Sequence, residues 1–423
     1  MGESWLILAD DLTGAADAAI AFARRGQRTE LTWGEHFAAE ASDASVLAYD
    51  CDSRRLGAAE AGAAHRAAAA RCLSRGPFSM LYKKIDSTLR GQPAAELAAL
   101  CGSLPAPFER AFGIFAPANP AMGRTTIGGR VFVHGEPLET TETWRREHAY
   151  PSADLAAIVE SAALRAIKLP LEQVRAGGAA LRAALAAAEA ADTRGTILIC
   201  DSETDDDLER IADAARAHGA PRFFIGTAGF ANALARNLPP VERPSIAVAP
   251  SRHGALVIVG SLASVARGAA RTLAATGGVR HFLFTAEILL GDDARMRTHM
   301  ALDIRAALDR GTDVLVEMPL AEVPDLSIGP ALVRALATCL APALSRMSGL
   351  IATGGETAAA MLRQCYVGGI RLVDEIEAGV SLGLMSRDHG VPIITKPGAF
   401  GDPQSLVRAL HTLRSIRQTG KMA

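Results

Sequence analysis

Short apolar runs alternate with alanine-rich stretches along the whole chain of 423 residues. The runs are rich in β-branched and aromatic residues, which is typical of buried strands. Strands are expected at 5–9, 46–49, 78–85, 111–116, 196–200 and 222–225, and in a second series at 255–259, 281–285, 313–317, 349–352 and 391–395. The stretches between them contain helix formers, such as 177–195, whose final glycine suits a helix end. This alternation predicts an α/β fold with largely parallel sheets flanked by helices.

The length of the chain suits two domains. The stretch NLPPVERPSIAVAPSRHG at 237–254 contains four prolines, which disfavour both helix interiors and central strands. We therefore expect an N-terminal domain at 1–237, a linker at 238–251 and a C-terminal domain at 252–423.

Composition narrows the class of protein. A net charge of -2 gives no electrostatic reason to expect nucleic acid or an anionic membrane as a partner. Six scattered cysteines without a CxxC pair are typical of a reduced, cytosolic protein. The first apolar run is too short for a signal peptide, and no stretch has the ~20 apolar residues that span a bilayer. A cytoplasmic protein is expected, and the sequence is compatible with a homo-oligomer.

Several familiar catalytic motifs are absent from the sequence. It contains no GxxxxGK[ST], no GxG spacing, no HExxH and no GxSxG. These absences argue against the usual Walker, Rossmann and protein-kinase loops, and against common zinc hydrolases and α/β-hydrolases.

Polar clusters instead follow the predicted strands. They lie at 10–11, 52–54, 86–88, 260–261, 353–355 and 396–398. Ligands of open α/β sheets bind outside the carboxyl ends of strands, so these clusters are the candidate binding residues.

Two of the clusters suit a small hydroxy acid. In LYKKIDSTLRG (81–91), alternation along a strand places Lys84 and Asp86 on one face, followed by Ser87 and Thr88. Lys84 would meet a carboxylate, and Asp86 would accept a hydrogen bond from a hydroxyl. An internal Lys–Asp pair with a serine helix cap is the structural alternative. In YDCDSRR (49–55), Arg54 could bind a carboxylate at two points, or the segment could be a solvated turn.

Three clusters of the second domain suit phosphates. In IATGGETAAAML (351–362), Gly354 and Gly355 open a helix whose backbone N–H groups can bind an anion, with Glu356 and Thr357 in its first turn. The same device is expected in VIVGSLASVARG (257–268), with Gly260, Ser261 and Ser264, and in ITKPGAFGD (394–402), with Gly398 and Gly401. Together they suggest a nucleotide pocket.

The ordered set of stretches resembles the four-carbon acid sugar kinase family. The resemblance runs from residue 9 to about residue 402 and rests on ADDLTGAAD, KKIDSTLRG, APANPAMGRTTIGGRVFVHG, Gly260-Ser261, TGGETA and KPGAFG. It implies an acid-sugar-binding N-terminal domain, a nucleotide-binding C-terminal domain and chemistry in the cleft between them. The implied reaction is ATP-dependent, Mg²⁺-assisted phosphorylation of the 4-hydroxyl of a four-carbon sugar acid.

The resemblance also implies roles for residues. Substrate contacts are implied for Asp10, Asp11, Arg54, Lys84, Asp86, Ser87 and Thr88, and ATP contacts for Ser261, Gly354 to Thr357, Gly398 and Gly401. Asp10, Asp11 or Asp86 would take the hydroxyl proton, with Asp11 as the expected base. Arg124 would meet the transferring phosphate or form a structural salt bridge. The KxDST form is similar to threonate and erythronate kinases, whereas Gln92 departs from the Asn expected there. We expect D-threonate, with D-erythronate or an oxo-tetronate as alternatives. A non-catalytic sugar-acid sensor and an aldolase or dehydratase are rivals from other classes.

Overall fold

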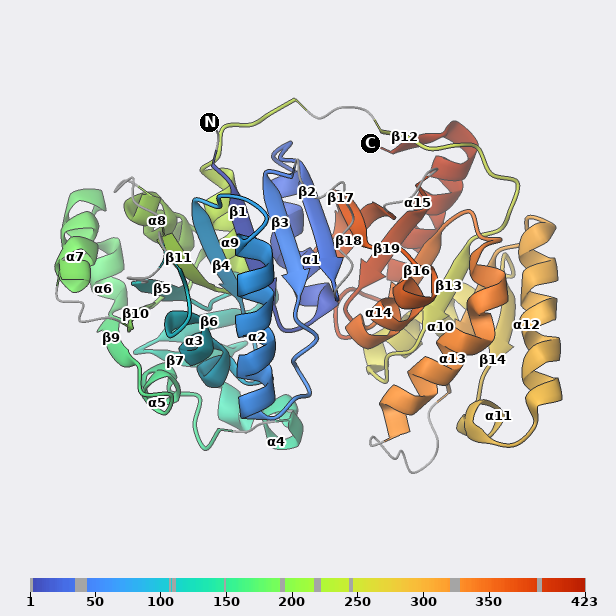
Figure 1. The fold of residues 1–423 in the computed structure, drawn as a ribbon, viewed down its shortest axis with the longest axis horizontal. Helices are drawn as coiled ribbons and strands as arrows, with labels where there is room; N and C mark the ends of the chain where they lie inside the picture. Colours follow the sequence, from blue (N-terminus) through green and yellow to red (C-terminus); the bar gives the residue numbers. More distant parts are fainter. Residues whose placement is uncertain are drawn as a thin grey trace. The chain divides into compact units, whose positions relative to one another are not determined.

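The chain divides within the proline-rich stretch. In the computed structural model, described residues up to Glu242 belong to one unit and those from Ile246 to a second (Figure 1). The structure describes residues 3–34, 44–105, 108, 112–147, 150–190, 195–216, 222–242, 246–319, 328–385 and 390–422.

A parallel sheet forms the centre of the N-terminal unit. Its strand order is β2 (Thr29–Trp33), β3 (Val46–Asp50), β1 (Trp5–Ala9), β4 (Met80–Lys84), β11 (Arg222–Gly226), β5 (Gly113–Ala116), β10 (Thr196–Cys200) and β9 (Arg165–Leu169). Each neighbouring pair is parallel. Strands such as WLILA are buried throughout, as expected of a parallel sheet covered on both faces.

Helices cover both faces of this sheet. Helices α1 (Leu12–Ala23), α9 (Ala228–Arg236) and α8 (Asp205–Arg216) pack in a row on one face, and α2 (Ala58–Leu73) and α3 (Pro93–Cys101) pack together on the other (Figure 1). The remaining helices are α4 (Glu142–Glu147), α5 (Leu155–Glu160), α6 (Leu171–Arg175) and α7 (Gly178–Ala190). A small antiparallel sheet consists of β6 (Arg124–Ile127), β7 (Arg130–Val133) and β8 (Glu136–Pro137).

The C-terminal unit has a mixed sheet. Its order is β14 (Arg280–Leu283), β15 (Val314–Glu317), β13 (Leu256–Val259), β16 (Leu350–Thr353), β19 (Pro392–Lys396), β18 (Val380–Met385) and β17 (Gly369–Glu377). The first five strands are parallel, whereas β18 is antiparallel to both its neighbours. A short antiparallel pair joins β12 (Ile246–Ala247) to β20 (Lys421–Met422).

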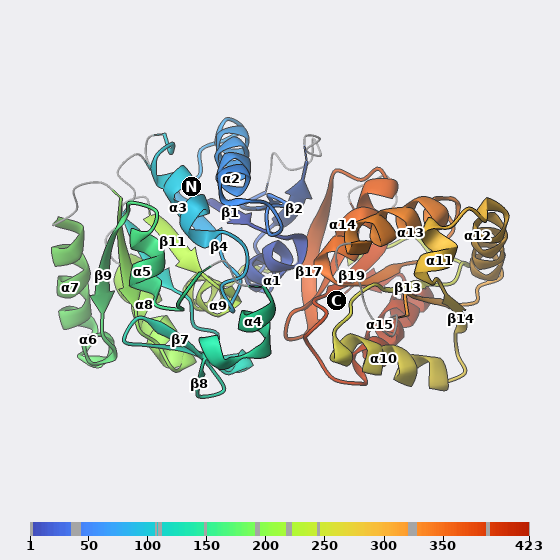
Figure 2. The ribbon, with the colours of Figure 1, turned by 90° about the horizontal axis from the view of Figure 1, so that it is seen from below.

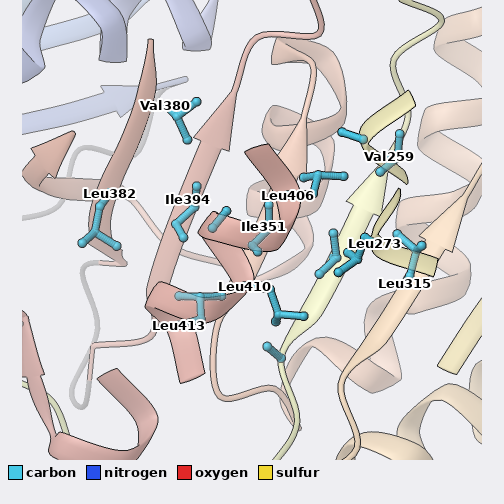
Figure 3. Packing of buried hydrophobic residues seen from close by; sticks show 14 of the residues in the cluster. Val259, Leu273, Leu315, Ile351, Val380, Leu382, Ile394, Leu406, Leu410 and Leu413 are labelled. Carbon is cyan, nitrogen blue, oxygen red and sulfur yellow. The ribbon is translucent and has the colours of Figure 1, made fainter. Parts of the chain in front are cut away.

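Helices also flank the sheet of the C-terminal unit. One face carries α10 (Ser264–Ala275) and α15 (Ser405–Thr419), and the other carries α11 (Ala286–Leu290), α12 (Ala294–Asp309), α13 (Gly329–Leu344) and α14 (Gly355–Gln364) (Figure 2). Between the sheet and the first pair lies an apolar core (Figure 3), in which Ile351 and Ile394 meet Leu273, Leu406 and Leu410. Burying each of these side chains contributes about 1.5–3 kcal/mol, so this core fixes the strands that carry the glycine loops.

The expected α/β fold with largely parallel sheets is confirmed. Several element bounds differ from the prediction: the strand expected at 78–85 is Met80–Lys84, and the one expected at 281–285 is Arg280–Leu283. The strand expected from residue 111 begins at Gly113, and residue 111 lies outside the described residues, as does 191–194 of the helix expected to end at Gly195. Strands β2, β9, β17 and β18 were not expected, because their sequences mix charged or polar residues into the apolar pattern. Among the described helices, none combines the length and apolarity that crossing a membrane requires.

Candidate active site

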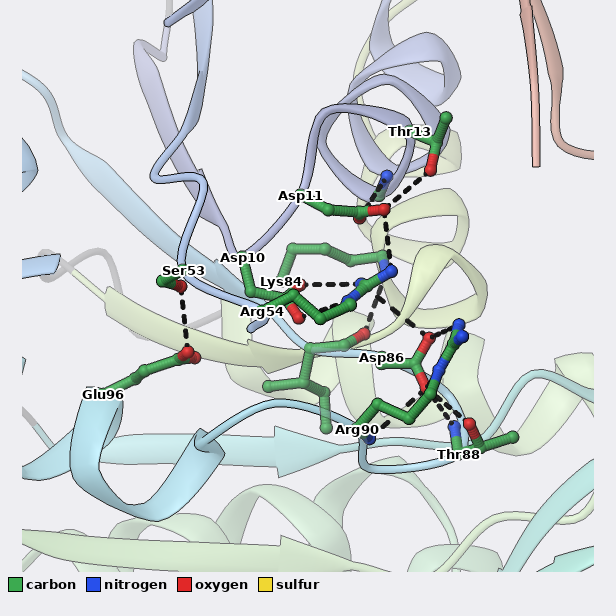
Figure 4. Close-up of polar contacts among 12 residues, drawn as sticks. Asp10, Asp11, Thr13, Ser53, Arg54, Lys84, Asp86, Thr88, Arg90 and Glu96 are labelled. Carbon is green, nitrogen blue, oxygen red and sulfur yellow. Dashed lines mark hydrogen bonds and ion pairs between the residues drawn. The ribbon is translucent and has the colours of Figure 1, made fainter. Parts of the chain in front are cut away.

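Three neighbouring strands bring the polar clusters of the N-terminal unit together. Strand β1 lies between β3 and β4, with Ala9 opposite Asp50 and Leu8 opposite Lys83. The segments that follow these strands therefore meet at one edge of the sheet, where they place Asp10, Arg54 and Asp86 beside one another (Figure 4).

The guanidinium of Arg54 is the centre of this group. It binds both carboxylate oxygens of Asp10, through Nε at 2.7 Å and Nη2 at 2.9 Å, and donates from Nη1 to Asp11 at 2.7 Å. Asp86 Oδ1 lies 3.8 Å from Nη2. Such two-point pairing fixes the plane of the guanidinium as well as its position.

The charges in the group shift the pKa of its carboxylates. Burial alone would raise the pKa of Asp10, but the charge and hydrogen bonds of Arg54 outweigh it and hold the pKa at about 2. For Asp86, burial is likewise outweighed by Arg90 and Arg54, so its pKa is well below the usual range. Both groups are therefore ionised at neutral pH and act as hydrogen-bond acceptors.

Asp86 is held by its own loop. Arg90 donates to it from Nε at 3.0 Å and from Nη2 at 2.8 Å, and Thr88 donates from its backbone at 3.1 Å and from its hydroxyl at 2.5 Å. The loop needs two left-handed residues, Leu89 and Gly91. A Cβ at Gly91 would lie 3.1 Å from Asp10 Oδ2, so glycine allows the loop to pass close to the cluster.

The ammonium of Lys84 has donors to spare. It is buried and donates to the carbonyl of Ile85 at 2.8 Å, its one hydrogen bond to described residues. An ammonium has three N–H donors. It lies beside Asp10 and Asp11 (Figure 4), and a Cβ on Gly14 would come within 3.3 Å of Nζ. In the described part of the chain, the structural alternative of an internal Lys84–Asp86 pair is not formed.

Asp11 has a second, structural role. It is the N-cap of α1, accepting from the backbone of Gly14 at 2.8 Å and from the hydroxyl of Thr13 at 2.8 Å. Helix capping explains part of the Asp-Asp-Leu-Thr-Gly pattern. Its side chain is 17% exposed, against 11% for Asp86 and 2% for Asp10. Asp11 is thus the most exposed carboxylate of the three.

Other predicted residues lie around this group. Ser87 is half-buried, and its hydroxyl has no partner among the described residues. Arg124 begins β6, and its Nη1 donates to the carbonyl of Met122 while its buried Nε has no partner in the described structure. The pKa of Arg124 is lowered, mainly by burial. The charge of Asp86 raises this pKa and that of Arg90 lowers it, so both side chains lie near Arg124.

Sequence reasoning missed Asp50. It ends β3, is buried, and accepts from the backbone of Asp52 at 2.8 Å. Burial, together with the nearby charges of Asp52 and Asp11, raises its pKa well above the usual range. The signal was present as a carboxylate closing an apolar run, but the expected strand ended one residue earlier, at Tyr49.

The glycine loops of the C-terminal unit also meet. A Cβ at Gly398 would lie 1.8 Å from Ser261 Oγ, and one at Gly260 would lie 2.1 Å from Thr357 Oγ1. Gly354 has φ of 90°, and a Cβ there would be 3.7 Å from that of Ser261. The loops that follow β13, β16 and β19 thus pack glycine backbone against the small side chains of Ser261 and Thr357, in a cradle that a side chain at Gly260 or Gly398 would fill.

Helix α14 begins in this cradle. Its N-cap is Gly354, which has no side chain to donate or accept a capping hydrogen bond. Gly355 is the first helical residue and is half-buried, Glu356 is exposed, and Thr357 is buried. An uncapped helix start beside close-packed glycines fits phosphate oxygens in chemistry and shape.

The other predicted nucleotide residues differ in their surroundings. Ser264 is the exposed first residue of α10, which also lacks a side-chain cap. Gly401 has φ of 83°, and a Cβ there would lie 2.2 Å from Ser405 Oγ and 2.7 Å from Glu377 Oε1. Gly401 therefore packs against α15 and the end of β17, whereas Gly398 packs against Ser261.

The donor set bears on metal binding. Within the described ranges, no group of three or more His, Cys, Asp or Glu side chains is placed to hold a metal ion. Mg²⁺ in nucleotide sites is commonly held by one or two carboxylates together with phosphate oxygens and water, which needs no such group.

Comparisons with known proteins match the two units of the chain to two different domain families. A family model described as "Sugar-binding N-terminal domain" matches residues 5–234, and one described as "Nucleotide-binding C-terminal domain" matches residues 256–406. The chain is 41% identical to a D-threonate kinase of Cupriavidus necator over 98% of this chain and 99% of that one. It is 32% identical to a D-threonate kinase of Bordetella bronchiseptica, over 98% of each chain, and 27% identical to a D-erythronate kinase of Heliobacterium modesticaldum, over 94% of each.

Solved structures share the fold. A Salmonella typhimurium LT2 protein superposes with a TM-score of 0.78 at 22% identity, covering 96% of this chain and 99% of that one. A Haemophilus influenzae protein gives a TM-score of 0.74 at 19% identity, covering 96% and 100%. With both domain models matched and identity to curated kinases extending over nearly the full length, the chain belongs to the four-carbon acid sugar kinase family.

Proposed function

We propose that the protein is an ATP-dependent kinase that phosphorylates the 4-hydroxyl of D-threonate. The observation that carries the proposal is Lys84, a buried cation with unused donors beside a carboxylate cluster. A sugar acid offers one carboxylate to such a cation and several hydroxyls to neighbouring carboxylates. The choice of D-threonate is supported by two relatives named D-threonate kinase, which are 41% and 32% identical to this chain.

The charges around Lys84 suit a monoanion. The group has one more cation than anion: Arg54, Lys84, Arg90 and Arg124 against Asp10, Asp11 and Asp86. The carboxylate of the acid would restore neutrality. In this proposal Lys84 binds the substrate carboxylate, and Asp10, Asp86, Ser87 and Thr88 line the hydroxyl positions.

The transfer itself requires an in-line approach. The 4-oxygen attacks the γ-phosphorus of ATP, the bond from that phosphorus to the β-bridging oxygen breaks, and ADP leaves. The hydroxyl proton passes to a carboxylate, for which we propose Asp11 because it is the most exposed of the three, with Asp86 as the alternative. Positioning and charge neutralisation contribute more to such reactions than the base does.

The nucleotide would lie on the glycine cradle of the C-terminal domain. The uncapped start of α14 would receive phosphate oxygens, with Gly354, Gly398 and Ser261 allowing their close approach. Mg²⁺ would be carried mainly by phosphate oxygens and water and would neutralise the charge that develops on them. Arg124 is proposed to meet the transferring phosphoryl group through its unpartnered guanidinium nitrogen.

Coupled ADP release tests the proposal. Purified protein with ATP and Mg²⁺ is assayed against D-threonate, D-erythronate, L-threonate and the 2-oxo- and 3-oxo-tetronates, and D-threonate is expected to give the highest kcat/KM. A higher kcat/KM for D-erythronate or an oxo-tetronate would keep the kinase and replace the substrate. Folded protein that binds ATP but turns over none of these acids would refute the proposed function, and folded protein without ATP binding would favour a sensor.

A further inference from the structure

A buried polar network lies behind Arg54, on the opposite side of β4 from Lys84. It consists of Ser53, His65, Lys83 and Glu96, each with no more than 1% exposure. We infer that Ser53, Glu96 and Lys83 are positioning residues that hold Arg54 in the orientation in which it orders the substrate site. The inference rests on the proposed function, because it names what aligns that same site.

The network is a short chain of strong contacts. Lys83 Nζ lies 2.8 Å from Glu96 Oε2. The hydroxyl of Ser53 donates to Glu96 Oε1 at 3.0 Å (Figure 4). Lys83 also donates to the carbonyl of Lys84 at 2.8 Å. One carboxylate oxygen of Glu96 therefore pairs with Lys83 of strand β4. The other accepts from Ser53, which belongs to the loop that carries Arg54.

His65 is not the cation that neutralises the Glu96 carboxylate. Its Nδ1 lies 3.1 Å from the carbonyl oxygen of Ala61, which can only accept, so Nδ1 carries the proton. Its Nε2 lies 3.7 Å from Glu96 Oε2, and burial, followed by the charge of Lys83, lowers the pKa of His65 to about 4. The imidazole is neutral at pH 7, so Lys83 is the cation that balances Glu96.

The loop joins this network to Arg54 through adjacent residues. The backbone N–H groups of Ser53 and Arg54 both donate to the carbonyl of Asp10, at 2.9 and 3.1 Å, after Asp52 has turned the chain with φ of 50°. From this turn the Ser53 side chain points to Glu96, and the Arg54 side chain points to the carboxylates. With Ser53 fixed, the Arg54 backbone is held independently of the ion pairs of its guanidinium.

That independence matters when the substrate binds. A sugar-acid carboxylate and its hydroxyls compete with Asp10 and Asp11 for the donors of Arg54. If the ion pairs alone fixed Arg54, their rearrangement would loosen the loop. A loop tied to Glu96 keeps its geometry, and a preorganised site loses less free energy on binding.

Replacing Ser53 by alanine tests the link. Ser53→Ala removes the hydroxyl and leaves the Lys83–Glu96 pair intact, and we expect KM for the acid to rise about 5- to 30-fold. KM for ATP should stay within about twofold, because the network belongs to the N-terminal unit and the proposed nucleotide residues belong to the C-terminal unit. Ser202→Ala is the matched control: it removes a buried serine hydroxyl at the same sheet edge whose oxygen has no hydrogen-bond partner in the described structure.

Two double variants separate the hydrogen bond from the ion pair. Lys83→Met with Glu96→Gln removes both charges but keeps an amide oxygen for Ser53, whereas Lys83→Met with Glu96→Leu removes the acceptor too. We expect the acid KM to rise at least about fivefold more in the second pair than in the first. Equal acid KM values in the two pairs would contradict the positioning role.

The outcomes separate this inference from the proposed function. If the wild-type protein turns over none of the acids, both the proposed function and the positioning role are refuted. Active wild type, with Ser53→Ala equal to Ser202→Ala in acid KM, removes the positioning role alone. If the KM values for acid and ATP rise together in Ser53→Ala, the substitution has loosened the protein structure as a whole. That result would also refute the positioning role.

Discussion

Replacing Arg54 by methionine should destabilise the N-terminal unit in a pH-dependent way. The methionine keeps most of the volume but leaves Asp10, which is 2% exposed, without its two-point partner. Removing one partner of a buried ion pair typically costs about 3–5 kcal/mol, because the remaining charge stays buried and uncompensated.

The pKa of Asp10 gives the net contribution that its ionisation makes to the stability of the wild type. Its ordinary value is 3.8 and its value in the folded protein is about 2. That difference corresponds to about 2 kcal/mol of stability at neutral pH. Since a depressed carboxyl pKa stabilises the fold above the unfolded value, the wild type loses this contribution only as the pH falls from about 4 through about 2.

The variant should show the opposite slope. Without Arg54, burial is the largest influence on Asp10 and raises its pKa above 3.8, while Lys83 and Lys84 oppose burial only in part. A raised carboxyl pKa makes folding less favourable as the pH rises through it. The gap in stability between wild type and Arg54→Met is therefore expected to be largest near pH 7.5 and to narrow towards about pH 4.5.

Tryptophan fluorescence can follow this unit within the intact protein. The three tryptophans of the chain, Trp5, Trp33 and Trp144, all belong to the N-terminal unit. Urea denaturation of the full chain, detected by their emission at both pH values, measures the gap. Arg236→Met is the matched control, since it breaks an ion pair with Glu209 in which both side chains are exposed, worth about 0–1 kcal/mol. A gap that equals the control, or that does not change with pH, would refute the buried-pair reasoning.

The substrate, nucleotide and metal sites give three further predictions. Lys84→Met should raise the acid KM at least about 10-fold with an unchanged ATP KM, and steady-state kinetics with either substrate varied would show an equal rise in both if the residue were only structural. Gly398→Ala should raise the ATP KM at least about 10-fold, because its Cβ would lie 1.8 Å from Ser261 Oγ. Gly329→Ala, with nothing within 4 Å of the new carbon, should match the wild type, and equal ATP binding by both variants would contradict the cradle. Excess chelator should abolish ADP release and added Mg²⁺ should restore it, whereas turnover that persists in chelator would exclude a divalent-metal requirement.

Local patterns predicted much of the site because they needed no knowledge of strand order. An apolar run ending in Asp10-Asp11 and another ending near Asp86 were enough to locate a polar sheet edge. The Asp86–Arg90 contact is also local, four residues apart. The Gly354-Gly355 turn likewise opens a helix where the sequence indicated it.

Local sequence patterns could not predict the contacts between residues that are far apart in the chain. The pairing of Arg54 with Asp10 joins residues 44 positions apart and depends on β3 lying next to β1. Glu96 meets Ser53 only because α3 packs beside α2 on the far face of the sheet. Alternation along β4 does place Lys83 opposite to Lys84, but it cannot name the partner that neutralises a buried lysine.

The ion pairs of this cluster keep buried carboxylates ionised. Carboxylates buried at a sheet edge would normally take up protons, and a protonated carboxyl is a poorer acceptor for a sugar hydroxyl. Arg54 prevents this at Asp10, and Arg90 together with Arg54 prevents it at Asp86. With a pKa of about 2, Asp10 cannot retain a proton at neutral pH, so in the proposed reaction it would orient a hydroxyl rather than store its proton. Under the proposed function, such a cluster would contribute mainly alignment and charge neutralisation, on which phosphoryl transfer chiefly depends.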